Sequence, residues 1–210
     1  MTAADPIILF HAPQSRSTGT LVLLEELGAP YELRLLNMKA GENRQPAYLA
    51  VNPMGKVPAI LHNGALVTEQ IAISIYLADL FPAAALAPGL DDPRRGPYLR
   101  WMAFYAGSFE PAAVDRAMKR EPGPQAMSPY GSFDAVLATL AAELQAGPYI
   151  IGEQFSAADV LWGGALQWMT MFGIVPATPE IQAYIERTTT RPAAVRARQR
   201  DAELAAAQSA

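Results

Sequence analysis

The sequence predicts an α/β domain over residues 1–82 and an all-α domain over residues 94–210. In the first domain, short apolar runs alternate with segments of helical spacing in the order β-α-β-α-β-β-α. Residues 81–93 are rich in Pro, Ala and Gly, and Pro82 and Pro88 prevent a long helix there. Beyond this linker the apolar residues recur at helical spacing.

The elements of the first domain follow from local signals. Residues 7–10 form a short apolar run and are expected to be a buried strand. The helix after it begins at the Ser and Thr residues of 15–18 and ends at Gly28, because Ser or Thr favours the start of a helix and Gly its end. Residues 31–36 supply the second strand. A hairpin over residues 57–68 turns at Asn-Gly, which suits a type I′ turn.

The second domain carries three marked features. Pro111 is expected to kink or interrupt its first helix. Ser156 and Asp159 have the spacing of a capping box, and residues 160–172 after them are apolar on nearly every side. We therefore expect this helix at the buried centre of the domain, where Gly163 and Gly164 would let a neighbour pack closely.

Composition excludes several functions. Hydrophobic residues make up 51% of the chain and charged residues 17%, which is typical of a globular protein. The net charge of −4 and the lack of a basic block argue against a nucleic-acid partner. The chain has no Cys and two His, so it has no thiolate nucleophile and we expect no metal site. No signal peptide or membrane-length apolar run is visible, so a cytoplasmic location is expected.

The segment from Asn52 to Pro58 is the most specific motif, with the pattern N-P-x-G-x-V-P. Proline cannot donate to a sheet ladder, so Pro58 belongs at the start or edge of a strand. The backbone N–H and C=O of Val57 are then free to face a ligand. Glu69 follows at the start of a helix, where the backbone N–H groups and the positive end of the dipole meet.

This segment resembles the glutathione-binding half of the glutathione S-transferases, and the order of elements resembles their thioredoxin-like domain. The resemblance implies that Val57, before a cis Pro58, pairs its backbone with the cysteinyl part of glutathione. It implies that Glu69 holds the γ-glutamyl end. Gln70 departs from the Ser that usually follows the acid. The alternative is a thioredoxin-like hairpin that only serves the fold.

Residues 150–159 resemble a second signature of the same family, so the resemblance covers essentially the whole chain. In that signature the Ser and Asp cap the central helix of the helical domain. The resemblance therefore makes Asp159 a folding residue and not a catalytic one.

The thiol of glutathione is largely protonated at neutral pH, so the protein must stabilise its thiolate. A hydroxyl at a helix N-terminus does this, which makes Ser15 and Ser17 the candidates, since the family places its catalytic residue in this stretch. One serine could instead only cap the helix while the other faces solvent. Arg16 could point at the sulfur or a carboxylate, or be solvated. Lys56 could hold the glycyl carboxylate, or be an exposed loop residue.

The resemblance implies that the electrophile site is built by the first helices of the second domain. Plausible lining residues are Tyr98, Trp101, Met102, Tyr105, Phe109 and Met118, although aromatic and Met stripes more often form a core. His11 and His62 are expected to be loop residues and not bases.

The expected function is a glutathione transferase, with glutathione as co-substrate and a small hydrophobic electrophile as partner. Glutathione-dependent isomerisation, reduction or ether cleavage on the same site is a second possibility. A non-catalytic binding or scaffold protein of the same fold is a third. The apolar composition and the resemblance also predict a homodimer.

Overall fold

The computed structural model describes residues 6–120 and 123–208, and these form two compact units. Unit 1 contains the described residues up to Ala84 together with those from Arg191 onward. Unit 2 is Ala85–Thr190. Each unit has its own core, and the candidate site lies in unit 1.

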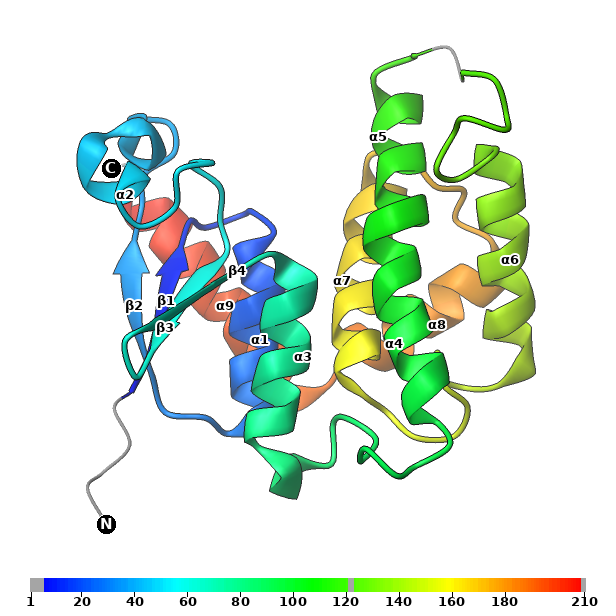
Figure 1. Cartoon of the computed structure of the whole chain (residues 1–210), viewed down its shortest axis with the longest axis horizontal. Helices are drawn as coiled ribbons and strands as arrows, with labels where there is room; N and C mark the ends of the chain where they lie inside the picture. The colour runs from blue at the N-terminus through cyan, green and yellow to red at the C-terminus, as the bar shows by residue number, and fades with distance from the viewer. Residues whose placement is uncertain (1–5, 121–122, 209–210) are drawn as a thin grey trace. The chain divides into compact units, whose positions relative to one another are not determined.

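Unit 1 is built on a four-stranded mixed sheet (Figure 1). Its strands are β1 (Ile7–His11), β2 (Tyr31–Leu35), β3 (Ala59–His62) and β4 (Ala65–Thr68), in the order β2-β1-β3-β4. β1 pairs in parallel with β2, and the other two pairs are antiparallel. The parallel pair needs a crossover, which α1 (Ser17–Leu27) supplies. The predicted α/β character of the first domain is confirmed.

The helices α1 and α3 (Gln70–Leu80) cover one face of this sheet (Figure 1). The buried side chains of this layer come mostly from alternate positions of the strands and from helix positions three or four residues apart. They include Ile7, Leu9, Leu21, Leu24, Ile60, Ile73 and Leu77. The type I′ hairpin is also confirmed, because Asn63 and Gly64 have φ angles of 50° and 77°. Short segments complete the unit: η1 (Glu42–Arg44), α2 (Pro46–Leu49) and η2 (Pro82–Ala84).

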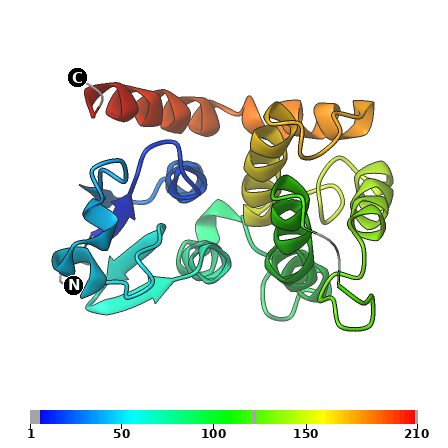
Figure 2. The same cartoon turned by 90° about the horizontal axis from the view of Figure 1, so that it is seen from above.

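The last helix, α9 (Pro192–Ala207), belongs to unit 1 and not to the helical domain in which the boundary 94–210 places it. It lies beside α1 (Figure 2). Arg191 forms a bidentate ion pair with Glu26 of α1, with N···O distances of 2.9 and 2.8 Å. These contacts join residues that are far apart in the sequence, so no local sequence signal could assign α9 to unit 1.

The named elements of unit 2 are all helices among the residues that the structure describes (Figure 1). Its elements are α4 (Arg95–Phe104), the π-helix η3 (Tyr105–Phe109), α5 (Glu110–Ala117), α6 (Phe133–Ala146), α7 (Ala157–Met171) and α8 (Pro179–Thr189). The expected interruption near Pro111 is confirmed as a π-helical turn. Pro111 has no N–H to donate to the α-helical hydrogen-bond pattern. The wider π-helical turn η3 precedes it and accommodates the loss of that hydrogen bond.

The core of unit 2 surrounds Trp162 of α7, whose indole N–H donates to the Trp101 carbonyl at 3.2 Å. Aromatic side chains from α4 and η3 pack around this ring. Five of the six predicted electrophile-lining residues are therefore core: Tyr98, Trp101, Met102, Tyr105 and Phe109 are at most 3% exposed. The alternative that such a stripe forms a core is therefore confirmed for these five residues, because a stripe at helical spacing marks a packed face equally well.

The first two-thirds of α7 is buried as expected, and its capping box is present. The Ser156 hydroxyl and N–H both donate to Asp159 Oδ2, at 2.9 and 2.8 Å. The last turn differs from the expectation, since Trp168, Met171 and Phe172 are exposed.

Gly163 and Gly164 offer a matched test of packing in unit 2. A Cβ on Gly163 would lie 2.1 Å from Thr188 Oγ1 of α8, whereas a Cβ on Gly164 would meet nothing within 4 Å. Gly163→Ala should therefore lower the free energy of unfolding by about 1–3 kcal/mol through overpacking. Gly164→Ala should raise it by up to about 1 kcal/mol, because Ala has the higher helix propensity. Equal urea midpoints for the two variants would contradict this packing.

Candidate functional site

The loop between β1 and α1 brings both predicted serines to the start of α1, in different environments. Ser17 is completely buried, whereas Ser15 is partly exposed and Arg16 between them is exposed. The Ser15 hydroxyl accepts the Ser17 N–H at 3.2 Å. Of the two candidates, Ser15 is the one that a molecule in solvent can reach.

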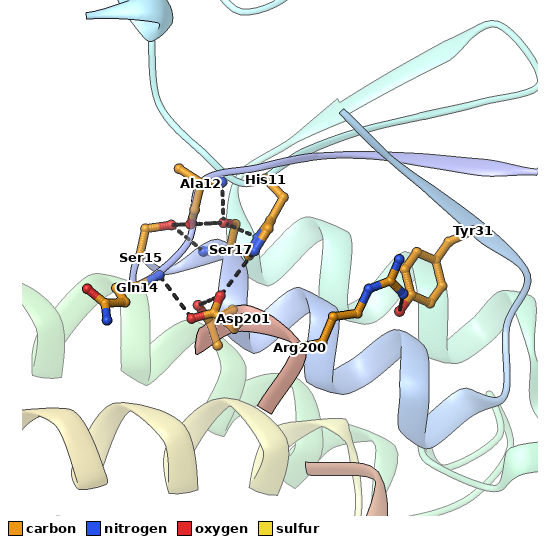
Figure 3. A network of polar contacts seen from close by, with 9 residues as sticks. His11, Ala12, Gln14, Ser15, Ser17, Tyr31, Arg200 and Asp201 are labelled. Carbon is orange, nitrogen blue, oxygen red and sulfur yellow. Dashed lines mark hydrogen bonds and ion pairs between the residues drawn. The ribbon is translucent and has the colours of Figure 1, made fainter. Parts of the chain in front are cut away.

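The two serine hydroxyls belong to one network (Figure 3). Ser17 Oγ lies 2.8 Å from Ser15 Oγ and 2.8 Å from Nδ1 of His11. The same oxygen accepts the Ala12 N–H at 3.1 Å. The Ala12 carbonyl is within reach of both hydroxyls, at 2.7 Å from Ser15 and 3.0 Å from Ser17. The hydroxyl protons therefore have more than one acceptor.

Both histidines lie in strands and are buried, so the expectation that they are loop residues was wrong. His62 ends β3, and its Nδ1 contacts the Tyr76 hydroxyl at 2.7 Å. His11 ends β1 and is 0% exposed. Its Nε2 lies at an ion-pair distance of 3.0 Å from Asp201 Oδ1 of α9, with the ring N–H directed away from the ideal hydrogen-bond line.

Asp201 is the functional candidate that the sequence did not reveal. Its carboxylate also accepts the Thr18 hydroxyl at 2.7 Å and the Gln14 N–H at 3.0 Å (Figure 3). Burial raises the pKa of Asp201, but the contacts with His11, Thr18 and Gln14 outweigh burial and leave that pKa below its ordinary value. No local pattern marks this residue, because it lies in an Ala- and Arg-rich helix far along the chain.

The second half of the site is the segment before β3. The Val57–Pro58 peptide bond is cis, as the resemblance implies, and β3 begins only at Ala59. Val57 is partly exposed and outside the sheet ladder. The Lys56 carbonyl accepts hydrogen bonds from the Tyr48 hydroxyl at 2.6 Å and the Asn52 amide at 2.9 Å, while the Lys56 side chain is exposed.

Glu69 precedes α3 in a backbone conformation that L-residues rarely adopt, with φ of 66° and ψ of 115°. Its side chain is exposed. Such outliers persist where the surrounding structure imposes them, and they cluster at functional sites. The observation thus adds physical support to a residue first selected from its position in the motif.

Gln70 joins the two halves of the site. Its Nε2 donates to the Arg16 carbonyl at 3.3 Å, which ties the start of α3 to the start of α1. Gly19 leaves room for this side chain, since a Cβ there would lie 2.8 Å from Nε2. Two helix N-termini therefore meet at one place, and the positive ends of their dipoles favour an anion such as a thiolate or carboxylate.

Comparison with known proteins decides the family. The N-terminal domain of the glutathione S-transferases matches residues 5–79, and their C-terminal domain matches residues 111–187. The chain belongs to the glutathione S-transferase family. Its mixed four-stranded sheet with helices, and its separate helical unit, have the fold of that family.

Relatives of this chain span almost its whole length. Glutathione S-transferase GstA of Escherichia coli O157:H7 is 27% identical and the match covers 88% of this chain and 93% of that protein. A glutathione transferase from Methylococcus capsulatus has a TM-score of 0.80 at 29% identity, with 94% and 99% of the two chains covered. A sphingomonad glutathione S-transferase complexed with glutathione has a TM-score of 0.77 at 31% identity, covering 93% and 98%.

A pocket of about 310 Å³ adjoins the serine loop. Its walls come from three segments of unit 1, namely the loop at Ala12–Gln14, the segment after β2 and the last turns of α9: Ala12, Pro13, Gln14, Leu36, Asn37, Met38, Lys39, Ala202, Ala205, Ala206 and Gln208. None of the predicted electrophile-lining residues is among them.

Among residues 6–120 and 123–208, no group of three or more His, Asp or Glu side chains is arranged to hold a metal ion. Within the same residues, no helix has both the length and the apolar character needed to span a bilayer.

Proposed function

We propose that this protein is a glutathione transferase in which the Ser15 hydroxyl stabilises the glutathione thiolate for attack on a small hydrophobic electrophile. The observation that supports this most is the Gln70–Arg16 contact, because it joins the α1 start that carries Ser15 to the α3 start that carries Glu69. The membership of the family supports glutathione as the co-substrate.

Ser15 fits the role of sulfur ligand on exposure and on electrostatics. It is the reachable serine, and it lies beside the positive end of α1. A hydroxyl that donates to a thiolate lowers the thiol pKa by stabilising the charged form. Ser17, being buried, acts on Ser15 and not on the ligand.

The ends of glutathione have matching groups. The Val57 backbone would pair with the cysteinyl segment, beside the cis Pro58. Glu69 would contact the γ-glutamyl ammonium, while the first-turn N–H groups of α3 at Gln70 would donate hydrogen bonds to the neighbouring carboxylate. The exposed cations Lys56 and Arg16 would hold the remaining glycyl carboxylate. The pocket behind Gln14 would take the electrophile.

The proposal is tested by calorimetry with glutathione and by turnover of a chloronitrobenzene substrate. Binding with turnover supports a transferase. Binding without turnover favours a scaffold protein, or an isomerase, reductase or ether-cleaving enzyme with another substrate. Absence of glutathione binding would overturn the proposal.

Glu69→Gly should weaken glutathione binding while preserving the fold. The variant removes a charge-assisted contact, at a cost of about 1.5–3 kcal/mol of binding free energy. Glycine also tolerates a positive φ, so the free energy of unfolding should stay equal or rise. Glu153→Gly, at an exposed loop position of unit 2, is the control that should leave affinity unchanged. Wild-type glutathione affinity in Glu69→Gly would remove Glu69 from the site.

Three broader features stay predictions. They are the homodimer, the cytoplasmic location and the contribution of the helical domain to the electrophile site. Sedimentation equilibrium tests the homodimer, because a monomer would have the single-chain mass of 22.6 kDa and a dimer twice that mass.

A further inference from the structure

The contacts behind Ser15 form a continuous chain of ionisable and hydroxyl groups that ends in a carboxylate (Figure 3). From the surface inward, the chain runs Ser15 Oγ, Ser17 Oγ, His11 Nδ1, His11 Nε2 and Asp201 Oδ1, with successive contacts of 2.8, 2.8 and 3.0 Å. Its outer end is partly exposed and the remaining three side chains are buried. Stabilisation of α1 alone does not need an ionisable ring at this place.

We propose that His11 and Asp201 are positioning residues of a buried proton relay, which takes the proton of the glutathione thiol through Ser15 and Ser17. The inference rests on the proposed function, because it assigns the sulfur to Ser15. Neither His11 nor Asp201 touches the ligand, and both act through the two serines.

The direction of the hydrogen bonds follows from the end groups. A carboxylate only accepts, so a neutral His11 places its proton on Nε2, which is 3.0 Å from Asp201 Oδ1 although off the ideal hydrogen-bond line, and leaves Nδ1 as an acceptor. Ser17 can then donate to Nδ1 and Ser15 to Ser17, in place of their bonds to the Ala12 carbonyl. In this resting state one lone pair of Ser15 Oγ accepts the Ser17 N–H, and the other is available to a proton from outside.

The relay conserves every proton. The thiol S–H bond breaks and its proton passes to Ser15 Oγ, while Ser15 gives its own proton to Ser17 and Ser17 gives its own to Nδ1 of His11. Each hydroxyl ends with one proton, the sulfur is negative and the imidazole is positive. The reversed hydrogen bonds now run outward, so that the Ser15 O–H points at the thiolate it must stabilise.

The surroundings of His11 suit a ring that gains charge on glutathione binding. Asp201 is the ionised group in contact with it, and Ser17 and Thr18 of α1 supply hydroxyls near this pair. Its ladder partner on β2 is the apolar Leu35. Two positive groups oppose this charge, namely Arg198, three residues before Asp201 in α9 and with a pKa lowered by burial, and Arg16 at the start of α1. The contact with Asp201 is what offsets them.

The competing explanation is that these contacts only attach the serine loop to α9. Arg191→Gln is the matched control, because the Arg191–Glu26 ion pair joins the same two helices without touching the relay. Asp201→Asn removes the charge with little change of shape. His11→Asn keeps a polar group toward Ser17 but cannot be protonated.

The measurement is the pH dependence of thiolate absorbance for bound glutathione in the full-length protein. In Asp201→Asn and His11→Asn, we expect the pH midpoint of thiolate formation to rise by about one unit. Well below the midpoint, this shift corresponds to about tenfold less thiolate than in the wild type. The alkaline plateau should be retained, and Arg191→Gln should match the wild type. An unchanged midpoint in both relay variants, or an equal shift in Arg191→Gln, would overturn the relay.

A second readout needs no substitution. The chain has two histidines, so ¹⁵N-histidine labelling gives two ring signals, and His62 serves as the internal control. We expect glutathione binding to protonate both nitrogens of His11 and leave those of His62 unchanged. A His11 ring that stays neutral beside a bound thiolate would refute the relay. A wild-type protein that forms no thiolate, or a Ser15→Ala variant that forms it normally, would instead refute the proposed function.

Discussion

Ser15→Ala should lower kcat/KM for conjugation about a hundredfold, which is the usual cost of removing one hydroxyl or amide donor to a developing anion. The Ser15 hydroxyl is the reachable donor at the start of α1, and the buried Ser17 cannot move out to replace it without losing its contacts with His11 and Ala12. The pH midpoint of thiolate formation should rise at the same time. Glutathione affinity should change less, because other groups hold its two ends.

The control is Ser132→Ala in unit 2. Ser132 also begins a helix, and its hydroxyl accepts the Ala135 N–H at 3.1 Å. Loss of that cap should lower the free energy of unfolding by about 0.5–2 kcal/mol and leave the thiolate midpoint unchanged. Wild-type turnover in Ser15→Ala would show that another group stabilises the sulfur.

Asp159→Ala should lower the free energy of unfolding by at least about 3 kcal/mol, well beyond the cost of a lost cap. The carboxylate accepts the Ile150 N–H at 2.7 Å and the Tyr184 hydroxyl at 2.8 Å, in addition to the two bonds from Ser156. All of these groups are buried, and truncation leaves several donors without partners at once.

Chemical denaturation of full-length protein measures this loss. Asp134→Ala is the matched control, since Asp134 also lies in the first turn of a helix, α6, but is exposed. This substitution should lower the free energy of unfolding by less than about 1 kcal/mol. In Asp159→Ala, the molecules that remain folded should bind glutathione normally. A variant with wild-type stability and no activity would contradict the structural role.

Local sequence signals were sufficient to predict those backbone features that depend on a few neighbouring residues. The type I′ turn at Asn63–Gly64, the interruption before Pro111 and the capping box of Ser156 and Asp159 all follow from steric or hydrogen-bonding rules within a short segment. The same holds for the Val57–Pro58 segment, since a proline cannot join the ladder.

Burial was harder to predict, because it depends on which faces meet. The stripe from Tyr98 to Phe109 could have lined a cleft or filled a core, and it fills a core around Trp162. The two histidines were expected in loops because each stands next to a turn in the sequence, and both lie in buried strand positions. Each is accommodated by a partner distant in sequence, Asp201 for His11 and Tyr76 for His62.

The sequence by itself determined the family, the α/β and all-α organisation, and the segments that carry Ser15, Val57 and Glu69. These depend on periodicity, turn chemistry and a motif, each of which is written in consecutive residues. Only the tertiary structure decided which serine is reachable, and only it brought Asp201 to His11. Burial and charge pairing are properties of surfaces in contact, and α9 reaches the serine loop across 187 residues of chain.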